Sequence, residues 1–220
     1  MSRVDDLARM PGRASSTRMT VEGDVAFQRL YVSRRAALAD LCCGIMEKVA
    51  VVGCGGSGKS HVARELGKIL GAPVTHLDAT FYDDQWNALP ADEFTRLQRR
   101  LVAQPRWVID GNYNSTLQVR LEACDTVVLM DVSTVAALYG ILSRQIRHGA
   151  GHQGNGVHNR ITWNVITYMA TYRRKMRPRV MAKIEEFAAG GADVVLLSTR
   201  RGARRWLREV AAEQPPSQSR

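Results

Sequence analysis

The sequence predicts an α/β fold in three layers, with a five-stranded parallel sheet and helices on both of its faces. Two observations lead to this prediction. From Met46 onward, short apolar runs alternate with segments of helical periodicity, a pattern typical of βαβ units. The chain has 220 residues, 45% of them hydrophobic, which is enough for one buried core and too little for two comfortable ones.

The apolar runs predict five strands, at 48–53, 73–78, 107–110, 126–131 and 193–198. Helices are expected near 59–70, 91–103 and 202–212. The second of these places Phe94, Leu97 and Leu101 on one face, as a helix against a sheet requires. Between the fourth and fifth strands the pattern is mostly helical, with a glycine-rich interruption at Gly149, Gly151, Gly154 and Gly156.

Residues 1–44 differ from the rest of the chain, because they mix Pro, Gly, Ser and Arg with one short periodic segment at 27–41. Two interpretations stay open. In the first, this segment is an extension that is poorly ordered or that is translated from a misassigned start, with the native protein beginning at Met46. In the second, it forms a helix that docks on the core. The domain is expected at 45–213, and residues 214–220 as a disordered tail.

The cysteines and the hydropathy of the sequence indicate in which cellular compartment the protein is expected. The four cysteines, Cys42, Cys43, Cys54 and Cys124, show no zinc-site spacing, which fits a reducing cytoplasm. No apolar run approaches the length of a membrane span, and the N-terminus lacks the apolar core of a signal peptide. A cytoplasmic protein without a membrane partner is therefore expected.

The segment from Gly53 to Ser60 matches GxxxxGK[ST], and it lies between a predicted strand and a predicted helix. Glycines in such a P-loop let backbone N–H groups converge on phosphate oxygens, and the helix N-terminus adds its dipole. Lys59 is predicted to reach the β- and γ-phosphates as a catalytic residue, and Ser60 to join a Mg²⁺ shell. The residues expected to bind ATP are Gly53, Gly55, Gly56, Ser57, Gly58, Lys59, Ser60 and His61.

Two acids end predicted strands beside this loop, where a nucleotide-bound magnesium needs a carboxylate. Asp110 is preferred as the magnesium residue, because the polar loop after it could also touch substrate. Asp131 is interpreted mainly as a helix cap, with a chemical role as the alternative.

Asp78 is expected to end the second strand, at the edge of the sheet where ligands bind. It is a candidate general base for a hydroxyl that attacks the γ-phosphate, and the alternative is an ordinary turn or N-cap aspartate. Tyr82 and Trp86 could line the acceptor pocket or belong to the core.

The positive charge is local. Of a net charge of +10, the segment 132–184 carries nine basic residues and no acidic one, and the rest is nearly neutral with 22 basic and 21 acidic residues. Arginines that flank mobile glycines are typical of a lid that closes over phosphates, here at about 139–180. We prefer this interpretation to a nucleic-acid patch or a solvated face.

These motifs together resemble the adenylate-kinase-like branch of P-loop kinases, and most closely the bacterial topology modulation proteins. The resemblance covers about 46–210. It rests on the P-loop, on His76-Leu-Asp78 with Phe81, Tyr82 and Trp86, on Trp107-Val-Ile-Asp110-Gly-Asn-Tyr113, on Arg120, on the strand that ends at Asp131, and on Arg177-Pro178.

The resemblance implies a P-loop NTPase fold with the P-loop strand at the centre of the sheet and an arginine-rich helical lid. It implies that Arg120 contacts substrate, that Arg144 and Arg147 begin the lid, that Arg173, Arg174 or Arg177 return from it, and that the base of ATP lies near 198–200. Among these, Arg144 and Arg174 are the arginines expected to act in catalysis, and Tyr113 to line the acceptor pocket with Asp78, Tyr82, Trp86 and Arg120. The chain lacks the Asp-Gly-Phe-Pro-Arg string of adenylate kinases, and its Asp78-x-x-Phe-Tyr is similar to uridine-kinase-like enzymes, which phosphorylate a hydroxyl.

The expected function is ATP-dependent phosphoryl transfer to a small-molecule, nucleoside or nucleotide acceptor, with ATP and Mg²⁺ as cofactors. The alternative is a regulatory ATPase associated with nucleic acid, although no nucleic-acid-binding motif supports it. In a weaker variant of the first hypothesis the acceptor is a nucleoside monophosphate, which would need no general base.

Overall fold

The computed structural model describes residues 46–81, 87–148, 163–188 and 191–213. All of them belong to one compact unit, Cys42–Arg220. The predictions for the extension, for Tyr82 and Trp86, for the glycine-rich interruption and for the tail fall outside these described residues.

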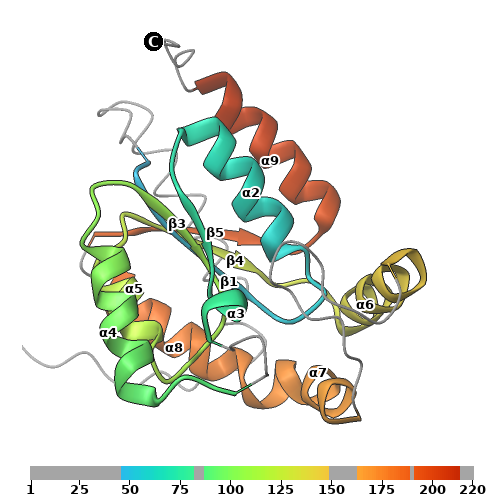
Figure 1. Cartoon of the computed structure of the whole chain (residues 1–220). Helices are drawn as coiled ribbons and strands as arrows, with labels where there is room; N and C mark the ends of the chain where they lie inside the picture. Colours follow the sequence, from blue (N-terminus) through green and yellow to red (C-terminus); the bar gives the residue numbers. More distant parts are fainter. Residues whose placement is uncertain (1–45, 82–86, 149–162, 189–190, 214–220) are drawn as a thin grey trace, which may run out of the picture. The chain divides into compact units, whose positions relative to one another are not determined.

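The predicted five-stranded parallel sheet is confirmed, with the order β2-β3-β1-β4-β5 (Figure 1). The strands are β1 (Lys48–Gly53), β2 (Val74–His76), β3 (Trp107–Asp110), β4 (Thr126–Met130) and β5 (Asp193–Leu197). The expectation that β1 is central is confirmed as well. Its residues Val49 to Val52 are fully buried because helices cover both faces of the sheet, which explains their continuous apolar run.

The second strand is shorter than predicted. It ends at His76, and Leu77 opens the short helix α3 (Leu77–Phe81). Asp78 therefore lies in the first turn of a helix, and the prediction that it ends a strand is wrong. The buried Leu77 continues the apolar pattern of the strand, although it packs with Phe94, Trp107 and Ile109 in a core cluster.

Helices lie on both faces of the sheet, as predicted (Figure 1). Helices α2 (Lys59–Leu70) and α9 (Arg200–Glu213) pack side by side on one face. Helices α4 (Ala91–Val102), α5 (Leu117–Leu121) and α8 (Arg177–Ala188) cover the other. Helix α9 is amphipathic, and it buries Ala203, Trp206, Leu207 and Val210 against its neighbours.

Helices α6 (Thr134–His148) and α7 (Trp163–Lys175) lie near the carboxyl end of β1 (Figure 1). The chain continues from β1 to β2 on one side of the sheet and reaches β4 and β5 on the other. In open parallel sheets such a switch point leaves a crevice outside the carboxyl ends of the strands, where ligands bind. No helix in the described part of the chain is long and apolar enough to cross a membrane.

Candidate active site

A glycine-rich loop connects β1 to α2, and its first residue has to be glycine because a side chain would not fit there. Gly53 has φ 144°, and a Cβ there would lie 2.5 Å from the Met130 carbonyl oxygen of the neighbouring strand. Gly56 has φ 67°, a left-handed conformation that side chains rarely adopt. The loop can therefore turn tightly against β4, and α2 begins at Lys59 directly after it.

Arg200, the first residue of α9, is hydrogen-bonded both to this loop and to α6. Its Nη2 donates hydrogen bonds to the carbonyl oxygens of Gly56, at 2.6 Å, and Ala136, at 2.7 Å. Gly140 makes room for it, because a Cβ at that position would overlap the Arg200 guanidinium. The sequence placed Arg200 only near the base of ATP, and its contact with the loop was missed.

Replacing Gly140 with alanine tests this packing. Alanine favours a helix interior by about 1 kcal/mol over glycine, but the new Cβ would overlap both the Arg200 guanidinium and the Gly56 carbonyl oxygen. Since overpacking costs about 1–3 kcal/mol, we expect a net loss in the free energy of unfolding measured in urea. The control is Val135→Ala on the same helix, where the side chain is 77% exposed; an equal loss in both variants would contradict this account.

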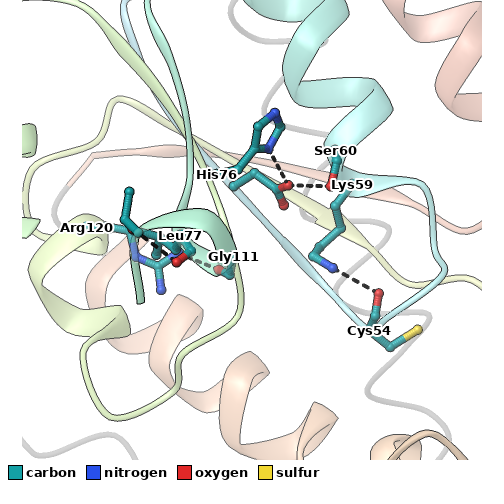
Figure 2. Close-up of polar contacts among 9 residues, drawn as sticks. Cys54, Lys59, Ser60, His76, Leu77, Gly111 and Arg120 are labelled. Atoms are coloured by element: carbon teal, nitrogen blue, oxygen red, sulfur yellow. Dashed lines mark hydrogen bonds and ion pairs between the residues drawn. The ribbon is translucent and has the colours of Figure 1, made fainter. Parts of the chain in front are cut away.

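Lys59 and Ser57 place polar groups in the loop. Lys59 Nζ donates a hydrogen bond to the Cys54 carbonyl oxygen at 3.1 Å (Figure 2). Ser57 is fully buried, and its Oγ has no hydrogen-bond partner among the described residues. A buried hydroxyl without a partner is costly, so this loop offers both a cation and an unused donor to a ligand. His61 is exposed at the start of α2, and its contact with a nucleotide stays a prediction.

Asp110 ends β3 beside this loop and is 5% exposed. Its Oδ2 accepts a hydrogen bond from Ser60 Oγ at 2.6 Å and lies 3.0 Å from His76 Nδ1 (Figure 2). Burial alone would raise the pKa of the Asp110 carboxyl, but His76, Lys59 and Ser60 together outweigh burial, and the pKa lies below its ordinary value. Asp110 is therefore ionised at neutral pH. The sequence includes His76 in a motif but indicates no role for it.

The oxygen atoms of Asp110 and Ser60 are suitable ligands for a magnesium ion. Asp110 Oδ1 is buried without a hydrogen-bond partner in the described part of the chain, and Ser60 Oγ lies next to the same carboxylate. Magnesium prefers oxygen ligands and usually binds through one or two protein groups together with waters and phosphates. The described residues contain no cluster of three or more His, Cys, Asp and Glu.

The predicted substrate residue Arg120 is fully buried. Its guanidinium donates a hydrogen bond to the Gly111 carbonyl oxygen at 2.5 Å (Figure 2). It donates a second hydrogen bond to the Asn112 carbonyl oxygen at 3.1 Å. Burial lowers the pKa of Arg120 to about 10, so it stays charged at neutral pH. This geometry favours holding the loop after β3 over touching a substrate.

The same loop has other anchors that sequence reasoning missed. Asn112 accepts a hydrogen bond from Gly53 N and donates one to Tyr168 on α7, both at 3.2 Å. Lys183 on α8 donates to the Asn114 carbonyl oxygen at 2.7 Å. The predicted pocket residue Tyr113 packs its ring against two others, Phe81 and Phe94, with centroids 4.8 and 4.9 Å away.

Asp131 is not the cap of α6, and that interpretation is wrong. Ser133 Oγ takes that place, accepting a hydrogen bond from Ala136 N at 3.2 Å. Asp131 instead accepts from Arg177 Nη2 at 2.8 Å, and Arg173 Nη2 lies 3.7 Å away. Two of the predicted lid arginines are thus held at the end of β4.

The other predicted lid and catalytic arginines stay predictions. Arg174 is exposed on α7, and the side chains of Arg144 and Arg147 lie outside the described residues. Asp78 is also exposed, on α3, at the carboxyl edge of the sheet.

The sequence matches no family model and no curated protein. Among the solved structures that are similar in fold are three kinases. An unliganded sugar kinase from Janibacter sp. HTCC2649 has a TM-score of 0.46 at 14% identity, over 76% of this chain and 93% of that one. A gluconokinase from Sinorhizobium meliloti 1021 has a TM-score of 0.46 at 15% identity, over 77% and 92%. Shikimate kinase from Acinetobacter baumannii, in complex with shikimate, has a TM-score of 0.43 at 14% identity, over 80% of this chain and 93% of that one. Likeness at this level says nothing of what this chain binds, and its membership of the topology modulation family stays a prediction.

Proposed function

We propose that this protein is a kinase that transfers the γ-phosphoryl group of ATP to a hydroxyl group of a small molecule. One observation carries the proposal. A glycine loop with the GxxxxGKS spacing opens a helix after the central strand β1, and its Ser60 is hydrogen-bonded to the ionised Asp110 at the end of the neighbouring strand β3. This pairing of a P-loop serine with a strand-end aspartate is what P-loop phosphotransfer needs around MgATP.

Each group of the loop has a role in this proposal. Backbone N–H groups of 53–58 and the N-terminus of α2 bind the phosphates, and Ser57 Oγ adds a buried donor. Lys59 moves its ammonium from the Cys54 carbonyl to the β- and γ-phosphates. Magnesium, held by Ser60 and Asp110, would neutralise charge that develops during transfer.

A hydroxyl acceptor is favoured over a phosphate acceptor because the two cations that lie against the loop after β3, Arg120 and Lys183, are already hydrogen-bonded to its backbone. Arg120 is buried and donates hydrogen bonds to two backbone carbonyl oxygens, and Lys183 donates one to the Asn114 carbonyl oxygen. The arginines of α4 are exposed, whereas its buried side chains are Phe94 and Gln98. Asp78, exposed on α3, is the group that would accept the proton of the attacking hydroxyl.

An acceptor screen tests this function. Purified full-length protein is incubated with MgATP and matched pairs of acceptors, each a nucleoside or sugar and its phosphate monoester, and ADP release is measured. We expect acceptor-dependent ADP release with at least one unphosphorylated member and not with its phosphate ester. A protein that binds ATP but shows no acceptor-stimulated turnover across the panel would count against a kinase, and faster turnover with a monoester would overturn the hydroxyl acceptor.

A further inference from the structure

His76 is built into the sheet next to the proposed magnesium carboxylate. It is the last residue of β2, and it is the register partner of Asp110 on β3. Side chains of register partners in neighbouring strands project from the same face of a sheet. The His76 side chain is 14% exposed and the Asp110 side chain 6%, so their contact is shielded from water on most sides.

The contact has a defined direction. The Asp110 carboxylate can only accept hydrogen bonds. His76 Nδ1, 3.0 Å from Oδ2, must therefore carry the proton and donate it to this bond. Ser60 Oγ donates to the same oxygen at 2.6 Å.

Two donors on one oxygen leave the other oxygen unused. Asp110 Oδ1 is buried and has no hydrogen-bond partner among the residues that the structure describes. A rotation of the carboxylate by less than half a turn would break both hydrogen bonds, and a half turn would only exchange two equivalent oxygens. His76 and Ser60 thus fix the carboxylate in the rotation that keeps Oδ1 free.

We propose that His76 is a positioning residue that holds Asp110 so that Oδ1 faces a nucleotide-bound divalent cation. The proposal rests on the proposed function, since it requires the P-loop to bind MgATP. Groups that orient metal ligands from behind typically contribute about 10–100-fold to metal affinity. His76 itself touches neither the nucleotide nor the reacting atoms in this account.

Two amide variants separate positioning from simple packing. Asparagine at position 76 places its Nδ2 close to where histidine has Nδ1, whereas glutamine places its amide nitrogen near the Nε2 position. Both are polar and similar in size, so His76→Asn and His76→Gln carry comparable risk to the fold. Only the asparagine variant retains a donor aimed at Asp110 Oδ2.

The experiment measures Mn²⁺ binding to the full-length protein saturated with ADP, by the electron paramagnetic resonance signal of free Mn²⁺. ADP binding is measured separately in EDTA. We expect His76→Gln to weaken Mn²⁺ binding by about 10–100-fold and His76→Asn by far less. ADP affinity in EDTA should stay the same in both variants.

Equal Mn²⁺ affinity in wild type and His76→Gln would overturn the positioning role, as would an equal loss in both variants. A loss of ADP affinity in EDTA that matches the loss of Mn²⁺ affinity would also overturn it, since that indicates general damage to the site. Wild-type protein that fails to bind ADP even with Mn²⁺ would refute the proposed function itself, and the inference with it.

Discussion

Replacing Lys59 with methionine is expected to lower ATP turnover by about 10³-fold. Methionine keeps the length and apolar stem of lysine but removes the ammonium, which lies at the loop and donates to the Cys54 carbonyl. Electrostatic groups aimed at developing charge usually account for the largest single share of catalysis. The measurement is acceptor-dependent ADP formation, with thermal unfolding recorded on the same samples.

Lys68→Met on the same helix is the matched control. The Lys68 side chain is 72% exposed and pairs with Glu65 at 2.9 Å on the surface. An exposed ion pair of this kind contributes about 0–1 kcal/mol to stability and nothing to the site, so turnover should match the wild type. The role of Lys59 would be refuted if Lys59→Met kept wild-type turnover, or if both lysine variants lost the same activity.

The second large effect is expected for Asp78→Asn, which should reduce turnover with a hydroxyl acceptor by about 10²-fold or more. Asparagine is isosteric with aspartate but cannot accept the proton of the attacking hydroxyl. ATP affinity should not change, because Asp78 lies on α3 and the nucleotide is bound by the loop after β1. Steady-state kinetics with the acceptor found in the screen, alongside ATP binding, provide the measurement.

Asp92→Asn is the control for this substitution, since Asp92 is likewise exposed in the first turn of a helix, α4. It should leave turnover unchanged. A mild effect of Asp78→Asn would show that no general base is needed, and would favour a phosphate group as the acceptor. A loss that appears in ATP binding instead would place Asp78 at the nucleotide.

The sheet could be predicted from the sequence because its strands are buried on both faces. Runs such as Val49-Ala50-Val51-Val52 are continuous and apolar, and they contrast with the amphipathic helices between them. The end of β2 could not be predicted. Leu77 is as apolar as a strand residue, and the five-residue helix α3 is too short to show a helical period.

In the candidate site, the local spacing of residues was enough to predict the glycine loop. The position of Asp110 at the end of an apolar run was enough to predict that it lies beside this loop. The missed residues act across long distances in the sequence. His76 meets Asp110 across 34 positions, and Arg200 meets Gly56 across 144. Such pairs depend on strand order and helix packing, which a single sequence does not reveal.

Arg120 illustrates the limit in another way. The resemblance to P-loop kinases implies that Arg120 contacts substrate, and nothing in the sequence around Arg120 indicates that its side chain is buried. The structure places its guanidinium on Gly111 and Asn112, where it holds the loop after Asp110. The concentration of positive charge in 132–184 has a partly structural cause as well, because Arg173 and Arg177 lie beside Asp131.

Calorimetric titration of ADP into the wild-type full-length protein, in Mg²⁺ and in EDTA, tests the central claim most directly. The claim is that the loop after β1 binds nucleotide phosphates with a divalent cation held at Ser60 and Asp110. We expect saturable binding at one site per chain, at least about tenfold tighter with Mg²⁺ than in EDTA, which corresponds to about 1.4 kcal/mol. Absence of binding under both conditions would contradict the nucleotide site, and equal affinity in Mg²⁺ and EDTA would contradict the cation at Asp110.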